Sequence, residues 1–259
     1  MAHSPAMSDS PAIEFVNVQY RTSENRVLLS NLDLAVRRSE ILMLLGPSGS
    51  GKTTSLKLIN CLLMPSQGRV AVDGRSTAEW DRIQLRRHIG YAIQEGGLFP
   101  HYTVRENVGL VPKLQGWDRT KIRSRIDEVL HMMGLPPEEF GDRYPDQLSG
   151  GQRQRVGLAR ALAADPPILL MDEPFGALDP ITRAELQKEF KQLQQRLGKT
   201  VVFVTHDVSE ALLLGNRVAV MSSGTLQGVY PPHDFLASGD PAVKPYVDAF
   251  RAMQQVLQS

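Results

Sequence analysis

Residues 46–53 read GPSGSGKT, and this stretch decides the fold that the sequence predicts. The apolar run 41–45 precedes it, and residues 54–63 follow with helical character. A strand, a glycine-rich loop and a helix in this order are typical of a phosphate-binding P-loop. The glycines let backbone N–H groups approach phosphate oxygens, and the helix adds the positive end of its dipole. The pattern therefore predicts a nucleoside triphosphate site.

The residues of this loop have distinct expected roles. Lys52 reaches the β- and γ-phosphates, and the hydroxyl of Thr53 holds Mg²⁺. The alternative is a glycine-rich turn with a chance lysine, but GxxxxGK[ST] should arise by accident in a chain of this length only on the order of 1% of the time. The expected nucleotide contacts here are Gly46, Pro47, Ser48, Gly49, Ser50, Gly51, Lys52, Thr53 and Thr54.

Length and composition limit the class of protein. The chain has 259 residues, 42% of them hydrophobic, with a formal net charge of +1 and a single cysteine. Such a length suits one large α/β domain or a core with an inserted subdomain. The near-neutral charge disfavours a nucleic-acid partner, which requires an obvious cationic excess. Because there is no signal-peptide pattern and no apolar run of about 18 to 20 residues, any work at a membrane is expected from its cytoplasmic side and through partners.

Hydrophobic periodicity gives the organisation of the chain. Strands are expected at 13–18, 27–36, 68–72, 168–171, 201–204 and 217–221, with Tyr20 in a polar loop. A helix after Asp179 should bury Ile181, Leu186, Phe190, Leu193 and Leu197. Helical spacing from 95 to 147 predicts an inserted helical subdomain. The expected division is a flexible tail (1–11), a first core part (12–94), the helical subdomain (95–147), a second core part (148–230) and a C-terminal tail (231–259).

Two further motifs carry chemistry. Asp172 ends the apolar strand ILLMDE, where it is placed to bind Mg²⁺, and Glu173 can polarise the attacking water as a general base. The alternative, a charge at a helix N-terminus, is disfavoured because Pro174 blocks simple continuation. LSGGQ at 148–152 places a hydroxyl and bare amides at the start of a helix, which predicts a second anion site. One domain binding one triphosphate does not need both sites, whereas two copies arranged head to tail do.

Together these motifs resemble the ATP-binding subunit of an ABC transporter, and the resemblance covers residues 13–230. It implies an α/β fold: a P-loop NTPase core with an antiparallel β subdomain and the inserted α-helical subdomain. It also implies an ATPase coupled to transmembrane transport, with ATP and Mg²⁺ as cofactors. In a nucleotide-dependent homodimer, each signature would contact the γ-phosphate held by the other chain, through Ser149, Gly150, Gly151 and Gln152.

Other family positions carry over individually. Gln94 matches the Q-loop glutamine, which touches Mg²⁺ and the attacking water, although it could be a polar strand end. Asp179 in FGALD matches the D-loop at the dimer interface, and it is also the expected N-cap of a helix. His206 in VTHD matches the switch histidine that works with Glu173. Tyr20 matches the aromatic that stacks on adenine, or else it packs on the sheet.

The insert QEGGLFPHYTVRENVGLVPKLQGW (94–117) resembles those of osmoprotectant importers for glycine betaine, choline or carnitine. This implies contact with two transmembrane permease subunits through the helical subdomain, an extracytoplasmic substrate-binding protein or domain, and a peripheral location on the cytoplasmic face of the plasma membrane. Phe99, Pro100 and Tyr102 are candidates for the groove that receives the permease, or are core of the insert. Larger relatives append CBS domains, and regulation through them is not expected because the chain stops at Ser259.

Three alternative functions are weighed on the same motifs. An importer for an amino acid or a polyamine would carry the same ATP site. A soluble ABC ATPase of translation or DNA repair is disfavoured, because there is one cassette and no sustained heptad pattern. A P-loop small-molecule kinase would leave LSGGQ and His206 unexplained.

Overall fold

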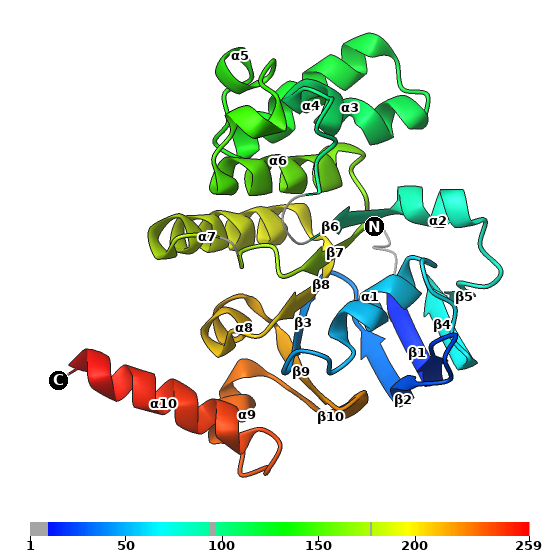
Figure 1. Cartoon of the computed structure of the whole chain (residues 1–259), viewed down its shortest axis with the longest axis vertical. Coiled ribbons are helices and arrows are strands. Elements are labelled where there is room, and N and C mark those ends of the chain that lie inside the picture. The colour runs from blue at the N-terminus through cyan, green and yellow to red at the C-terminus, as the bar shows by residue number, and fades with distance from the viewer. Residues whose placement is uncertain (1–9, 94–96, 177, 259) are drawn as a thin grey trace, which may run out of the picture.

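The computed structural model describes residues 10–93, 97–176 and 178–258, which build two sheets flanked by helices (Figure 1). The first sheet is antiparallel, in the order β2-β1-β4-β5. Its strands are β1 (Ile13–Arg21), β2 (Val27–Val36), β4 (Gln67–Val72) and β5 (Arg75–Ser76). Alternate apolar residues of this sheet, such as Phe15 and Leu32, are buried, as the period of two in a strand requires.

The second sheet has the order β10-β9-β3-β8-β7-β6, and only β10 pairs antiparallel to its neighbour. Its strands are β3 (Ile41–Leu45), β6 (Ile89–Ala92), β7 (Ile168–Asp172), β8 (Thr200–Thr205), β9 (Arg217–Ser222) and β10 (Thr225–Tyr230). Every residue of β3, β7 and β8 is buried, which explains their continuous apolar runs. Because parallel strands end at one edge, the residues that follow β3, β7 and β8 come together there.

Helices cover both faces of this second sheet. On one face α1 (Lys52–Ile59) packs with the antiparallel sheet, so Leu44 and Val202 share a core with Leu56. On the other face α7 (Pro180–Leu197) and α8 (Val208–Leu214) bury Met43 and Phe203. The remaining helices of the core are α2 (Arg82–His88), α9 (Pro232–Ala237) and α10 (Lys244–Gln258). The chain ends on α10, which begins against α8 and leads away from the sheets (Figure 1).

A helical region is inserted between β6 and β7. It contains α3 (Val104–Leu114), α4 (Arg119–Met132), α5 (Pro137–Phe140), a short 3₁₀ helix (Pro145–Gln147) and α6 (Gly150–Ala163). Both α3 and α4 pack on α6, which in turn lies against β6. The α/β class and the antiparallel sheet are therefore confirmed. The domain limits stay a prediction, and α6, assigned from sequence to the second core part, packs with the inserted helices.

Two local predictions were wrong. Tyr20 lies inside β1 rather than in a loop, because shifts of the β1–β2 pairing after Phe15 break the alternation by which a strand is recognised. Ile181 is 75% exposed, although Leu186, Phe190 and Leu193 of the same stripe are buried. Ile181 occupies the first turn of α7, whereas Phe190, further along the helix, meets the sheet at Phe203. The exposed Ile181 leaves an apolar side chain on the surface beside Asp179.

Candidate functional site

The loop between β3 and α1 forms a tight cradle at the sheet edge. A Cβ on Gly46 would lie 2.2 Å from the carbonyl oxygen of Met221, so only glycine fits against β9 at this position. Gly51 has φ of 100° and leads into α1 without any side-chain cap. The first N–H groups of α1 are therefore left for a ligand, which the helix dipole makes suited to anions. A cavity of about 220 Å³ opens here, lined by residues that include Ser48, Lys52 and Thr53.

Lys52 is the cation of this cradle and is 5% exposed. Its Nζ donates hydrogen bonds to the carbonyl oxygens of Gly46 at 2.8 Å and Pro47 at 2.9 Å. Burial lowers the pKa of Lys52, while the charges of Glu173 and Asp172 act in the opposite direction. The ammonium is thus held by neutral oxygens that a more strongly attracting anion can displace.

A hydroxyl and a carboxylate meet beside Lys52. The Thr53 Oγ1 donates to Asp172 Oδ1 at 3.0 Å, which joins the start of α1 to the end of β7. Burial raises the pKa of Asp172, and the hydrogen bond from Thr53 opposes that rise. Oxygen donors of this kind suit a hard cation such as Mg²⁺, which takes few protein ligands and completes its shell with water and phosphate. These two residues fit the metal site expected from the sequence.

Glu173 and His206 form the next pair along the same edge. His206 Nδ1 lies 3.2 Å from Glu173 Oε2, with the imidazole 65% and the carboxylate 23% exposed. Glu173 has φ of 46°, a left-handed conformation that is unusual for a non-glycine residue and often marks a functional site. The Glu173 backbone N–H donates to the carbonyl of Val204 on β8, which holds this turn against the neighbouring strand. The predicted base and switch histidine are therefore in contact.

The signature motif occupies a separate cavity. Ser149 caps α6 through a capping box: its Oγ accepts from the Gln152 N–H at 3.2 Å, and Gln152 Oε1 accepts from the Ser149 N–H at 2.9 Å. A cavity of about 400 Å³ is lined by Ser149, Gly150, Gly151 and Gln152, together with Asp179. Among the described residues, none lines both this cavity and the one around Lys52.

Asp179 has the capping role expected from the sequence. Its Oδ1 accepts from the N–H groups of Ile181 and Thr182 at 3.2 and 3.0 Å. The backbone hydrogen bond from Thr182 is the main reason that the pKa of Asp179 is lowered. The D-loop aspartate and the signature thus lie at one surface of the chain. Their expected contacts with nucleotide and partner stay predictions.

The structure does not test the roles predicted for two residues, Gln94 and Tyr20. Gln94 lies outside the described residues, so its contacts with Mg²⁺ and water stay a prediction. Tyr20 is partly buried and packs against the core between α1 and the antiparallel sheet. That placement fits the alternative weighed for it, an aromatic side chain packing on the sheet, and its stacking on adenine also stays a prediction.

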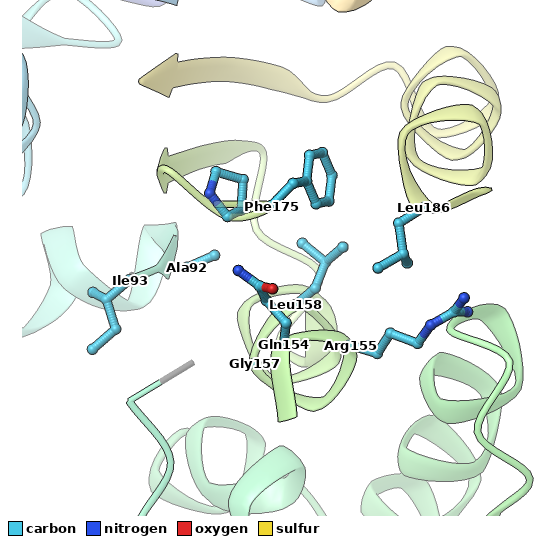
Figure 2. Close-up of a pocket in the computed structure, with 9 residues that line it drawn as sticks. Ala92, Ile93, Gln154, Arg155, Gly157, Leu158, Phe175 and Leu186 are labelled. Carbon is cyan, nitrogen blue, oxygen red and sulfur yellow. The ribbon is translucent and has the colours of Figure 1, made fainter. Parts of the chain in front are cut away.

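Two further residues, Gln154 and Tyr91, were not predicted from the sequence. Figure 2 shows Gln154 on α6, and with Ala92 and Phe175 it lines a cavity of about 10 Å³. Within the described structure, neither polar atom of this buried amide has a hydrogen-bond partner. Tyr91 on β6 faces Asp172, and burial together with that carboxylate raises the pKa of Tyr91. No motif marks either residue; only the pairing of β6 with β7 places Tyr91 near Asp172.

Comparisons with known proteins agree with this geometry. The glycine betaine/carnitine/choline transport ATP-binding protein OpuCA of Bacillus subtilis is 47% identical over 95% of this chain and 63% of its own length. The spermidine/putrescine import ATP-binding protein PotA of Oleidesulfovibrio alaskensis is 47% identical over 80% of this chain and 54% of its own length. The chain thus spans less than two thirds of the length of these curated relatives.

Solved structures and a family model complete the comparison. A dimeric ATP-binding cassette in a post-hydrolysis state, bound to ADP and Pi, is 37% identical with a TM-score of 0.77, covering 85% of this chain and 98% of that one. In the described parts of the chain, none of the helices combines the length and apolar character that crossing a membrane requires. Residues 29–176 match the family model described as ABC transporter. The chain therefore belongs to the ABC transporter family, with the fold of its ATP-binding cassettes.

Proposed function

We propose that this protein is the ATP-hydrolysing subunit of an ABC importer. The observation that carries the proposal is the meeting, at one edge of a parallel sheet, of the Lys52 ammonium, the Thr53–Asp172 pair and the Glu173–His206 pair. These groups supply a charge for the phosphates, oxygen ligands for a cation and a base for water. Family membership and the names of the relatives support the same reading.

Binding of ATP would begin at the cradle. Lys52 would exchange the carbonyls of Gly46 and Pro47 for the β- and γ-phosphate oxygens, since hydrogen bonds to charged acceptors are the stronger ones. Thr53 and Asp172 would hold Mg²⁺, with Gln94 as the further ligand expected from the sequence. The bound ion would neutralise charge on the phosphates.

Hydrolysis would depend on Glu173. Its carboxylate is ready to accept a proton from the attacking water, and His206 at 3.2 Å orients it. The left-handed backbone at Glu173 turns the chain out of the strand directly after Asp172, and the Glu173 carboxylate lies against His206. A positioned base contributes a factor of about 10² to 10⁴ to a rate.

A second copy of the chain would complete the site. The signature cavity and the Lys52 cavity on one chain have no described lining residue in common, which supports a site completed by a second chain. In a head-to-tail homodimer, the Ser149 hydroxyl and the N–H groups of Gly150 and Gly151 would meet the γ-phosphate of the other chain. The exposed Ile181 beside Asp179 would be covered in such a dimer.

Glu173→Gln tests this function. The variant keeps the shape of the side chain but cannot act as the base, so hydrolysis should fall by about 10²- to 10⁴-fold. Its affinity for ATP with Mg²⁺ should stay within about threefold, because Lys52 is untouched. Phosphate release and calorimetric titration measure the two quantities. Glu138→Gln, an exposed glutamate on α5, is the matched control and should behave as wild type. Turnover at the wild-type rate in Glu173→Gln would overturn the proposal.

The permease is proposed to dock in a groove between α3 and α4. This groove measures about 870 Å³, and its lining includes Tyr102, Leu110, Trp117, Ile122 and Arg123. Lys113 and Arg119 add positive charge, whereas Arg105 is paired with Asp127 at 2.8 Å. An amphipathic permease segment with acidic residues would fit this chemistry. Of the three residues expected in the groove from the sequence, Tyr102 lines it and Phe99 and Pro100 do not.

Leu110→Glu tests the groove. A carboxylate in its apolar floor should abolish co-purification with the cognate permease subunits, because burying an unpaired charge is costly. Basal ATP hydrolysis should stay within about twofold of wild type. Leu114→Glu is the matched control, since Leu114 is 58% exposed on the same helix and does not line the groove. Normal co-purification of Leu110→Glu would place the permease elsewhere.

The solute is proposed to be a quaternary-ammonium osmoprotectant. The support is the match to OpuCA over 95% of this chain, against 80% for PotA at the same identity. PotA nevertheless favours a polyamine as the second candidate. The protein would work as a peripheral subunit at the cytoplasmic face of the plasma membrane, and an extracytoplasmic binding protein would deliver the solute. Uptake of labelled glycine betaine and of labelled spermidine, with and without this protein, separates the two candidates.

A further inference from the structure

Arg183 joins the two loops that carry the catalytic pair. It lies in the first turn of α7, and its Nη2 donates to the carbonyl oxygen of Leu178 at 3.1 Å, in the loop after β7. Its Nη1 lies 3.8 Å from Asp207 Oδ2, in the loop after β8. One guanidinium therefore contacts both the segment that follows Glu173 and the residue that follows His206.

The two carboxylate oxygens of Asp207 have different partners. Its Oδ1 caps α8, accepting from the N–H groups of Ser209 at 2.8 Å and Glu210 at 3.3 Å. Its Oδ2 faces Arg183. Because Asp207 directly follows His206, its position fixes the backbone that carries an imidazole which is itself 65% exposed. A shift of Asp207 would move the imidazole relative to Glu173.

The surroundings of Arg183 are acidic. A cavity of about 30 Å³ is lined by Glu173, Asp207 and Glu210 as well as by Arg183 and His206. Burial raises the pKa of Glu210, while hydrogen bonds from Thr205 and Gln187 and, to a smaller extent, the charge of Arg183 act to lower it. The guanidinium thus offsets repulsion among carboxylates that come from two separate loops.

We propose that Arg183 is a positioning residue that fixes the loop after β8 to the loop after β7, and so keeps His206 against Glu173 during ATP hydrolysis. The inference rests on the proposed ATPase function. Arginine suits this role because its planar fork presents separate nitrogens to the Leu178 carbonyl and the Asp207 carboxylate. A lysine ammonium is a single point charge and would serve these two partners less well.

The first test is Arg183→Gln. Because the residue acts on the catalytic pair and not on the Lys52 cradle, kcat should fall about tenfold while KM and the affinity for ATP stay within about twofold. Arg183→Lys should lie between Arg183→Gln and wild type. Arg196→Gln, the same change at an exposed position near the other end of α7, should match wild type in every measurement.

The second test is a double-mutant cycle with Asp207→Asn. Asparagine keeps an oxygen to cap α8 but removes the charge that faces Arg183. If Arg183 acts through Asp207, the double variant should have a kcat no lower than that of Arg183→Gln alone, whereas independent effects would multiply. If Arg183→Gln does not fold, Asp207→Asn alone should show the tenfold fall in kcat with unchanged KM.

Several results would overturn the inference. One is a wild-type kcat in Arg183→Gln, measured beside a wild-type protein that does hydrolyse ATP. Another is a loss of kcat, ATP affinity and melting temperature to a similar degree, which would indicate a merely structural role. Failure of the wild-type protein itself to hydrolyse ATP would instead overturn the proposed function, and this inference with it.

Discussion

The chain has two helix N-termini that face cavities and are expected to bind phosphate, and they are built differently. The N-terminus of α1 has no side-chain cap, and the loop wraps it so that Lys52 is only 5% exposed. The N-terminus of α6 is closed by a complete capping box, and Ser149 and Gly150 are exposed. The first end therefore combines uncapped N–H groups with a buried cation, whereas the second is a capped helix end whose first residues are exposed.

The difference indicates how each end can serve a ligand. The first N–H groups of α1 have no side-chain cap, so they are free to donate to a phosphate, which the helix dipole also favours. At α6, Ser149 Oγ uses its acceptor capacity on the Gln152 N–H, but its own proton stays available to donate. A phosphate presented by another molecule can therefore bind at α6 without breaking the cap. The α1 end thus suits the primary phosphate site, and the α6 end suits a second site that closes over a phosphate already bound by another chain.

Of the substitutions that distinguish the two helix ends, loss of the Lys52 charge should have the largest effect, and that effect is on ATP affinity. Lys52→Ala removes the ammonium that would meet two phosphate groups, so ATP affinity should fall by at least about 100-fold, in line with losing charge-assisted hydrogen bonds of roughly 1.5–3 kcal/mol each. Calorimetric titration with ATP and Mg²⁺ measures this affinity. Lys188→Ala, an exposed lysine on α7, is the control. Wild-type affinity in Lys52→Ala would show that this cradle does not bind ATP.

Blocking the signature motif (148–152) should have the next largest effect. It should prevent dimer formation without changing the affinity of the monomer for ATP. In a Glu173→Gln background, ATP with Mg²⁺ should convert monomer to dimer in gel filtration, because a ligand that binds the dimer preferentially shifts the equilibrium toward it. Adding Ser149→Arg should abolish that dimer, since the larger side chain would fill the cavity meant for the partner's phosphate.

A matched substitution separates this effect from a general one. Ser124→Arg makes the same change at an exposed position of α4, outside both cavities, and should leave the dimer intact. ATP affinity of the Ser149→Arg monomer should equal that of its parent, because the Lys52 cradle is unaltered. Dimerisation of the Ser149→Arg protein at the parent's ATP concentration would count against the head-to-tail arrangement.

The features that could be predicted from the sequence are those that depend on neighbouring residues. The P-loop, the Asp172–Glu173 pair and LSGGQ were found because each is a short local pattern whose chemistry depends on neighbouring residues. Buried strands such as β7 were found because both faces are covered, giving a continuous apolar run. The meeting of Glu173 with His206 followed only from family resemblance, as strand order in a sheet is a long-range property.

What the sequence could not predict depends on tertiary placement. Ile181 fits the apolar stripe of α7, yet it lies in the first turn of that helix and is exposed, so the prediction that it is buried was wrong. Arg183 and Gln154 carry no motif, because their importance depends on which loops and strands surround them. Tyr20 was placed in a loop because an irregular pairing of β1 with β2 disturbs the period of two.

The smallest expected effect separates the capping role of Ser149 from its proposed role toward phosphate. Ser149→Ala removes one cap and should lower the free energy of unfolding by about 1 kcal/mol, within the range measured for lost N-caps. Thr103→Ala is the matched control, because Thr103 forms the same kind of capping box with Glu106 at the start of α3. Both variants should therefore lose similar stability in urea titrations.

The two variants should differ in ATP-driven assembly. In the Glu173→Gln background, Ser149→Ala also removes the hydroxyl proton proposed to reach the partner's phosphate, so its dimer should need at least about tenfold more protein to form. One lost hydrogen bond to a charged acceptor is worth roughly 1.5–3 kcal/mol, which corresponds to about a tenfold effect or more. Thr103→Ala should dimerise as its parent does, since α3 does not line the signature cavity. Equal dimerisation of both variants, with equal loss of stability, would reduce Ser149 to a helix cap and leave Gly150 and Gly151 as the anion donors.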